Sequence, residues 1–444
     1  MSNLVRTIRQ RDLLYLFIGS VIGSGIFIAP GLVLRQVHNS VGLSLLIWVV
    51  GGVLSLMGAL TYSELAAANP EAGGLYCYIR DGFGRLPAFL YGWCLFLVIA
   101  GATIAALARA FTQYLNEIVP LTPLQSSVVA VAMIAVVTVV NIWGTRESSN
   151  LQNVTTFIKA GLVVLLSALL LSRGHHASEL APAMGTDLRG FTLFSSFGLA
   201  MIAVLWAYEG WQFGTYSAGE VVEPEKAFPK AFLMGSLLLM GLYLIAVLAY
   251  LVALGPKAAS ETDAIAATAA RAVLGDWAGK LVAATILISV FSSTNSVILT
   301  APRVFYAMAK DNLFFKSLAK VHPKFHTPAA AVVALGVWAA ILTNAGKFSE
   351  LVEGVVFVGW IFYGLGAAAI FPLRKALQGK AIPYRVPGYP WTPLLFVLAA
   401  VVIVGNAIYR ATIDPKEILH VLAALALLAA GVPAYFFWHR RTNL

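Results

Sequence analysis

The segment IGSVIGSGIFIAP, residues 18–30, decides how this sequence is interpreted, because three glycines and two serines interrupt a long apolar run. A glycine in a helix interior costs about 1 kcal/mol relative to alanine. A helix that only crosses a bilayer gains nothing from this weakness. Two explanations are open: a helix broken at membrane depth, or a close helix contact at Gly19-x-x-x-Gly23, which matches the small-residue packing motif of membrane helices.

The composition places the whole chain in a membrane. Of 444 residues, 59% are hydrophobic and 11% are charged, whereas soluble domains carry about 25% charged residues. Runs long enough to cross about 30 Å of hydrocarbon predict twelve spans. These are residues 13–35, 42–67, 84–115, 124–143, 152–172, 193–217, 230–254, 277–308, 328–345, 351–373, 391–411 and 418–438. We therefore expect an all-α membrane protein with twelve transmembrane helices, forming one domain over residues 1–444.

The positive charge is attributed to topology. The formal net charge is +10, and 19 of the 30 Lys and Arg residues fall in the termini and in the connections predicted to share their side. Basic residues favour the cytoplasmic side of a membrane, so both termini are predicted to be cytoplasmic in a multi-pass cell-membrane protein. No nucleic-acid partner is expected. With 7 His and 2 Cys, Cys77 and Cys94, which we interpret as free thiols, we expect no metal site and no cofactor.

A second interruption lies in the sixth predicted span. Its apolar run, which contains WAYEGWQF, stops at Glu209 and Gly210. Residues 13–172 and 193–373 would then form two five-helix halves, with residues 391–438 as two additional helices. Because five is odd, the second half enters the membrane from the opposite side. Interrupted spans at corresponding positions of two inverted halves point to a transporter binding site.

The physics of a broken helix suggests the ligand. Backbone groups freed in lipid must be satisfied, so such a break lines a cavity or is buried in protein. Ser24, Gly25 and Ile26 would present N–H groups and the positive end of a helix dipole to an anion. The carbonyl groups around Val21, and around Trp206 and Ala207, would favour a cation. An L-α-amino acid carries both groups, and we predict it as the substrate.

Four segments resemble a known family. They are GSVIGSGIFIAP, YSELAAANPEAGGLYCYI, WAYEGWQFGTYSAGEVVEPEKAFPKA and STNSVILTAPRVFYAMAKDNLF. They are similar to the amino acid–polyamine–organocation superfamily, and most similar to its L-type amino acid transporter branch, which includes bacterial serine/threonine exchangers. VHPKFHTP and YRVPGYPWTPLLF extend the resemblance over nearly the whole chain. It implies twelve helices, a 5+5 inverted repeat with broken helices 1 and 6, and alternating access.

The resemblance also implies roles for single residues. Ser24 and Gly25 would bind the substrate carboxylate, the backbone at Val21 and Trp206 would receive the ammonium, and Trp206 would close over the substrate as an aromatic gate. The predicted substrate site comprises Val21, Gly23, Ser24, Gly25, Ile26, Trp206, Ala207, Glu209 and Gly210. Mammalian members have glycine in place of Glu209. Contact with the substrate, support of the broken backbone and pairing with a distant cation therefore all stay open for this residue.

Lys159 is the predicted coupling residue. A lysine at the centre of a membrane helix costs about 2.5–3.5 kcal/mol. The resemblance places it between spans one, five and eight, near Ser292, Ser293 and Asn295, and the alternative is that it reaches outward to the interface. In sodium-coupled members of this fold, a cation bridges the first broken helix to span eight. Lys159, with Ser293, would replace that cation, which predicts sodium-independent exchange of neutral amino acids.

The same residues leave other transport functions open. A proton-coupled symporter and a cationic amino acid or polyamine antiporter are the alternatives. A channel would need a continuous polar lining or charged rings, and an intramembrane enzyme would need a nucleophile and a base at depth, neither of which the sequence suggests. In mammalian heteromers, a cysteine between spans three and four joins an ancillary chain, and LNEIVPLTP lacks one. No disulfide-linked partner is therefore expected.

Four charged residues lie near the predicted cytoplasmic connections. Glu64 and Arg80 flank the NPEAGG connection and are expected to be structural or gating charges. Arg303 and Asp311, at the end of the eighth span, are expected to form an interface pair with each other.

Overall fold

The computed structural model describes residues 4–344, 348–378, 381–412 and 415–442. Within these ranges the protein is helical, and an isolated parallel β-bridge joins Ile8 to Val221. The helices of the first half are α1 Gln10–Val21, α2 Gly25–Gln36, α3 Val41–Ala68, α4 Leu75–Phe83, α5 Arg85–Cys94, α6 Gly101–Asn116, α7 Pro123–Trp143 and α8 Thr145–Arg173. The remaining helices are α9 Gly190–Ala207, α10 Phe213–Tyr216, α11 Pro224–Glu261, α12 Ile265–Leu274, α13 Asp276–Thr300, α14 Pro302–Lys310, α15 Ala329–Leu342, α16 Phe348–Ala368, α17 Ile370–Ala376, α18 Trp391–Ala411 and α19 Pro415–Thr442. The all-α prediction is confirmed.

Most of the predicted spans correspond to helices that can cross a membrane. Ten helical stretches of the described chain are long and apolar enough, and an eleventh is obtained when the bent pair α1 and α2 is counted as one span. The ninth predicted span, residues 328–345, corresponds to α15, which has 14 residues in its described helix. It is apolar but shorter than the others. The described structure therefore supports ten to eleven spans rather than the full twelve.

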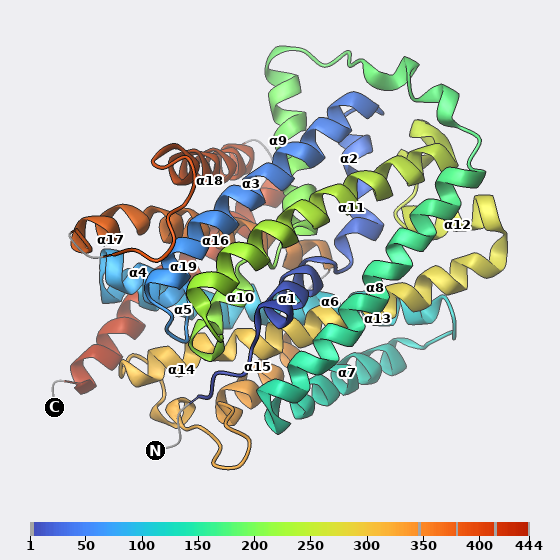
Figure 1. Cartoon of the computed structure of the whole chain (residues 1–444). Coiled ribbons are helices and arrows are strands. Elements are labelled where there is room, and N and C mark those ends of the chain that lie inside the picture. Colours follow the sequence, from blue (N-terminus) through green and yellow to red (C-terminus); the bar gives the residue numbers. More distant parts are fainter. Residues whose placement is uncertain (1–3, 345–347, 379–380, 413–414, 443–444) are drawn as a thin grey trace.

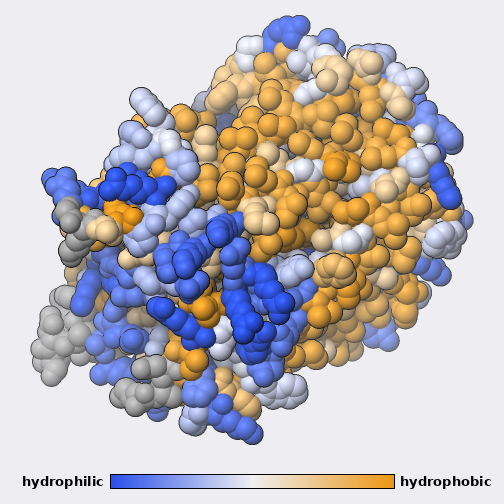
Figure 2. Space-filling view, viewed as in Figure 1, coloured by the Kyte–Doolittle hydropathy of each residue, from blue (hydrophilic) through white to orange (hydrophobic). Residues whose placement is uncertain are grey.

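The surface matches a protein embedded in lipid. Figure 2 shows a broad hydrophobic surface between hydrophilic ends of the molecule. Large apolar side chains are exposed in the described structure, for example Leu124 at 74% and Phe157 at 69%. In a bilayer these side chains would contact acyl chains instead of water. The N- and C-terminal ends lie on the same side of the molecule (Figure 1).

The helices divide into central and peripheral ones. The most enclosed spans are those made of α5 and α6, of α13 and α14, and of α16 and α17. Most of the length is exposed in α7, α8, α9, α18 and α19. α3 and α11 pack side by side along one face (Figure 1). α1 packs against α8, α11 and α13, and α2 packs against α9. α1 therefore contacts the enclosed α13 directly, whereas α9, the long part of the second interrupted span, packs on α2 and leaves most of its own length exposed.

Candidate functional site

The two predicted interruptions are real, and they contact each other. α1 ends at Val21 and α2 starts at Gly25 with a bend of 44°, while α9 ends at Ala207 and α10 starts at Phe213. A Cβ atom on Gly25 would lie 2.5 Å from the Cα atom of Ala207, which leaves room only for glycine. Gly210 has a φ of +115°, and a Cβ there would lie 2.9 Å from the Ser20 carbonyl oxygen. Both glycines are required because the two breaks pack against each other.

The start of α2 presents unpaired donors. In the described chain, the backbone N–H groups of Ser24, Gly25 and Ile26 have no hydrogen-bond acceptor, and the buried Ser24 hydroxyl has no partner either. Buried polar groups without partners cost free energy, so these donors favour a ligand that accepts hydrogen bonds. The N-terminus of a helix, with its positive dipole end, is an anion-binding position.

The carbonyl ends of α1 and α9 are held by a tyrosine that sequence analysis did not identify. The Tyr243 hydroxyl, on α11, lies 3.0 Å from the carbonyl oxygens of both Val21 and Ala207. It has one proton and donates to one of them at a time. The Trp206 carbonyl accepts a hydrogen bond from the Glu209 N–H at 3.1 Å. The carbonyl groups predicted to receive an ammonium therefore already have protein donors.

A small cavity lies between the two breaks. It is lined by Ser20, Val21, Gly23, Ser24, Gly25, Thr103, Leu107, Trp206, Glu209, Phe213, Ser293 and Val297. Of the predicted site residues, Ile26, Ala207 and Gly210 do not line it. Its volume is about 30 Å³, which is room for water rather than for an amino acid. Admitting a larger ligand requires its lining side chains to move.

Five of the lining residues were missed by sequence analysis. They are Ser20, Thr103, Leu107, Phe213 and Val297. Apolar and small polar side chains on an apolar helix give no periodic signal that distinguishes a cavity from packing. Thr103 and Leu107 are four residues apart on α6 and therefore lie on one helix face.

Glu209 is held by side chains from its own segment and from α16. Its Oε1 accepts hydrogen bonds from the Tyr363 hydroxyl at 2.5 Å and from Gln212 Nε2 at 2.6 Å. Gln212 Nε2 also donates to the Tyr363 hydroxyl at 2.8 Å. The Tyr363 carbonyl in turn accepts from Tyr62 at 2.9 Å. These contacts connect the carboxylate to the surrounding helices, and they favour support of the broken segment.

Lys159 points inward, so the alternative that it reaches outward to the interface is wrong. Its side chain is fully buried. Its Nζ donates to the carbonyl oxygens of Gly19 and Ile22, both at 2.6 Å, and lies 3.3 Å from Ser293 Oγ. Ser289 also donates to the Ile22 carbonyl, at 2.8 Å. The freed carbonyl groups of α1 therefore have donors from α8 and α13.

The other two expected neighbours of Lys159 contact a different residue. Ser292 Oγ accepts from Gln152 Nε2 at 3.2 Å, and Asn295 Nδ2 donates to Gln152 Oε1 at 3.0 Å. Gln152 lies on α8, two turns before Lys159. This amide network links α8 to α13 on the side of the break that faces the chain termini.

Comparison with known proteins identifies the family. A family model described as amino acid permease matches residues 8–428. The chain belongs to this amino acid permease family. The serine/threonine exchanger SteT of Bacillus subtilis is 32% identical over 441 residues, which cover 96% of this chain and 95% of that protein. The human cystine/glutamate transporter is 30% identical, over 95% of this chain and 83% of that protein. The mouse b(0,+)-type amino acid transporter 1 is 28% identical, over 95% and 86%. Because this is a family of transporters, the expectation that the chain is not an enzyme is confirmed.

At the end of the permease where its termini lie, a buried ion pair joins four segments. Arg303 Nε, on α14, lies 2.7 Å from Glu220 Oε2. Thr145, at the start of α8, donates to Glu220 Oε1 at 2.7 Å. The Glu220 carbonyl also accepts the N–H groups of Thr7 and Ile8. The expectation that Arg303 pairs with Asp311 is wrong, because Glu220 enters this space from the connection that follows α10.

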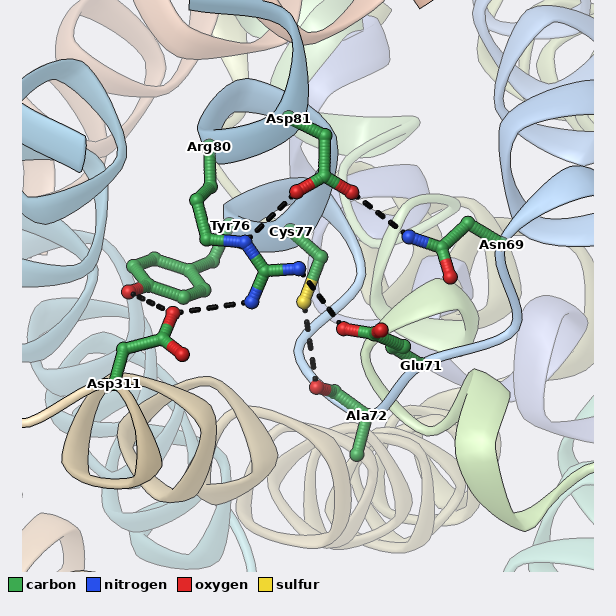
Figure 3. Close-up of polar contacts among 8 residues, drawn as sticks. All are labelled: Asn69, Glu71, Ala72, Tyr76, Cys77, Arg80, Asp81 and Asp311. Carbon is green, nitrogen blue, oxygen red and sulfur yellow. Dashed lines mark hydrogen bonds and ion pairs between the residues drawn. The ribbon is translucent and has the colours of Figure 1, made fainter. Parts of the chain in front are cut away.

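Asp311 belongs to a separate cluster around Arg80 (Figure 3). The Arg80 guanidinium lies 3.0 Å from Asp311, 2.9 Å from Glu71 and 2.8 Å from Asp81. The Tyr76 hydroxyl donates to Asp311 at 2.8 Å. The Arg80 cluster therefore connects α4 to the end of α14.

Glu64 has a different partner from Arg80. It pairs with Arg374 of α17 at 2.6 Å and accepts the Val386 N–H at 2.6 Å. These contacts connect the end of α3 to the segment that follows α17.

Cys77 lies inside the Arg80 cluster. Both cysteines of the permease are free and buried. The Cys77 Sγ lies 3.5 Å from the Ala72 carbonyl oxygen, which is a weak contact (Figure 3). Burial raises the pKa of the Cys77 thiol, with Glu71, Asp81 and Asp311 adding to the shift and Arg80 opposing it. The thiol is therefore protonated and unreactive at neutral pH.

Proposed function

We propose that this permease exchanges neutral L-amino acids across the cell membrane by alternating access, without sodium. The observation that carries the proposal is the set of unpaired N–H groups at Ser24, Gly25 and Ile26, beside a central cavity and opposite the carbonyl end of α9. The similarity to a serine/threonine exchanger and to a cystine/glutamate transporter supports amino acids as the substrate class.

In the proposed complex, the substrate carboxylate accepts hydrogen bonds from Ser24 and Gly25. The ammonium replaces the Tyr243 hydroxyl at the carbonyl groups of Val21 and Ala207. Trp206 moves aside to admit the substrate and then covers it, which fits a cavity of about 30 Å³ that is too small for an amino acid when closed. Binding and closure are thereby linked through the same two broken helices.

Lys159 supports sodium independence in this proposal. The Lys159 Nζ at the Gly19 and Ile22 carbonyl groups occupies the place where a bound ion would otherwise join α1 to α13. The preference for neutral substrates rests on Glu209, since Tyr363 and Gln212 both donate to one of its oxygens. A carboxylate with two donors attracts a substrate cation less strongly than an unpaired one.

The proposal includes the topology. α15 serves as the ninth of twelve spans, residues 13–172 and 193–373 form inverted repeats, and both termini are cytoplasmic. The absence of cysteine from residues 115–123 agrees with transport by this chain without a disulfide-linked ancillary protein.

The test is transport by the purified permease in liposomes. Vesicles preloaded with unlabelled serine should take up labelled serine, alanine or leucine much faster than empty vesicles, and replacing sodium with choline should change nothing. Uptake into empty vesicles driven by an inward acid gradient would instead identify a proton symporter. Faster transport of arginine or agmatine than of the neutral amino acids would refute the proposed substrate class, and an unsaturable flux would indicate a channel.

A further inference from the structure

A second polar cavity lies between the end of α6 and the start of α7. It is lined by Arg109, Thr112, Gln113, Asn116, Leu121, Pro123 and Ser126, and its volume is about 340 Å³. These residues come from the last two turns of α6, the connection after it and the first turn of α7. No carboxylate is among the described residues that line it. Among the described residues that line the cavity, Arg109 is the charged one.

Arg109 supplies the charge, and within the described part of the chain only its Nε has an acceptor. Its Nε donates to the Thr343 carbonyl at 2.6 Å, just after the end of α15. For its two Nη groups, the described chain offers no acceptor and no ion-pair partner. An arginine places these donors in a fork that matches two oxygens of a phosphate or carboxylate. The nearest acidic residue in sequence, Glu117, is paired with Arg271 at 2.8 Å.

The other lining groups also suit an anion. Gln113, Asn116 and Ser126 each carry a side-chain donor. α7 has 21 residues and starts at Pro123, so the positive end of its dipole lies at the cavity wall. Arg109 thus adds a full charge to a position that already favours anions.

The surroundings indicate that the anion carries a hydrocarbon chain. Leu124, Val128 and Val131 are exposed at 74%, 59% and 37%, and their spacing puts them on one face of α7. This apolar face begins beside the cavity and continues along α7. A headgroup in the cavity would continue into acyl chains along α7, as a membrane phospholipid does.

We propose that this cavity binds the phosphodiester group of a phospholipid, held by Arg109 and anchored by acyl contacts with α7. Through the Thr343 carbonyl, Arg109 also joins α6 to the end of α15. Leu107, two residues earlier on α6, lines the central cavity. Occupation of the lipid site therefore stabilises the helix that carries one wall of the transport site.

The test is native mass spectrometry of the full chain, delipidated in detergent and titrated with phosphatidylglycerol. The variants are Arg109→Gln, Arg109→Lys and Arg35→Gln. Arg35 is a matched control, because its Nε also donates to a backbone carbonyl, that of Ser260, but Asp263 occupies its Nη2. Size-exclusion profiles establish that each variant is folded.

We expect the delipidated wild type and Arg35→Gln each to bind one phosphatidylglycerol with the same affinity. Affinity should be about tenfold weaker in Arg109→Gln, since a charge-assisted pair is lost, and partly restored in Arg109→Lys. Diacylglycerol, which lacks the phosphate, should bind equally weakly to all four proteins. Equal phosphatidylglycerol binding by the wild type and Arg109→Gln would overturn the site. Displacement of the lipid by millimolar glycerol phosphate would show a site for free anions instead.

Discussion

The Lys159 ammonium lies 2.6 Å from the Ile22 carbonyl oxygen, at the point where α1 stops being helical. The same ammonium lies 2.6 Å from the Gly19 carbonyl oxygen. A break in a membrane helix leaves carbonyl groups that must find donors. Here a side chain from α8 supplies them, so the broken conformation of α1 depends on a residue from another helix.

Replacing Lys159 should therefore abolish exchange. In Lys159→Ala, the Ile22 carbonyl keeps the Ser289 hydroxyl, and the Ser293 hydroxyl can donate to either the Gly19 or the Ile22 carbonyl, one at a time. Losing charge-assisted hydrogen bonds worth about 1.5–3 kcal/mol each should reduce serine exchange more than tenfold in liposomes. Lys226→Ala, at an exposed ion pair, should exchange normally. A strict sodium requirement in the wild type that persists in Lys159→Ala would contradict the role given to this lysine.

Tyr243 should determine how firmly substrate is held. Tyr243→Phe removes the hydroxyl that competes with a substrate ammonium for the Val21 and Ala207 carbonyl groups, while the ring packing is kept. We expect a lower KM together with a lower maximal exchange rate, because the empty site loses the bridge between α1 and α9. Both constants come from initial rates of serine exchange.

Tyr250→Phe is the matched control for Tyr243→Phe. Tyr250 lies two turns further along α11, and its buried hydroxyl has no partner in the described structure. Its removal should leave both constants unchanged. An unchanged KM in Tyr243→Phe would mean that the ammonium binds elsewhere.

Ser24 should contribute to carboxylate recognition. Ser24→Ala deletes an unpaired donor at the start of α2, and a hydrogen bond to a charged group is worth about 1.5–3 kcal/mol, so KM for serine should rise roughly tenfold or more. Ser44→Ala removes another buried, unpaired hydroxyl, on α3 outside the cavity, and should have no effect. If serine methyl ester inhibits uptake as well as serine does, the carboxylate site is misplaced.

Substitution of Glu209 should show whether its carboxylate supports the broken segment or contacts the substrate side chain. If the carboxylate holds the broken segment through Tyr363 and Gln212, Glu209→Gln should slow the exchange of serine, leucine and alanine by similar factors. Tyr363→Phe should do the same, because it removes one of these two donors. A change of preference between lysine and leucine in Glu209→Gln alone would place the carboxylate against the substrate side chain.

The sequence predicted those parts of the site that violate the composition of a membrane helix. Gly23, Ser24 and Gly25 lower the helix stability of the first span, and Glu209 with Gly210 interrupts the sixth. Both helix breaks can therefore be predicted from the amino-acid sequence. Lys159 is visible for the same reason, since a charge at membrane depth is expensive. These residues could be identified because each one raises the free energy of a helix that only has to cross a membrane.

The missed residues carry no such cost. Tyr243, Tyr363 and Leu107 lie on apolar helices that are hydrophobic all round, where lipid-facing and inward-facing positions have the same composition. Partners distant in sequence were missed as well. Asp311 is eight residues from Arg303, yet Glu220 is the residue that reaches Arg303, because the pairing is decided by helix packing.

The Arg80 cluster should control access to the Cys77 thiol. In Arg80→Gln, the ion pairs to Glu71 and Asp311 are lost, and the two carboxylates repel each other, so α4 should separate from α14 and expose the buried thiol. With Cys94 replaced by alanine, maleimide labelling of Cys77 should be several times faster in Arg80→Gln than in the parent protein. Burial raises the pKa of this thiol, and the thiolate is the reactive form, so labelling of the parent should be slow at pH 7 and should accelerate as the pH rises. Arg85→Gln, on the neighbouring helix α5, is the control for a general effect of lost charge at this surface. Equal labelling rates in Arg80→Gln and the parent protein would mean that the cluster does not hold α4 against α14.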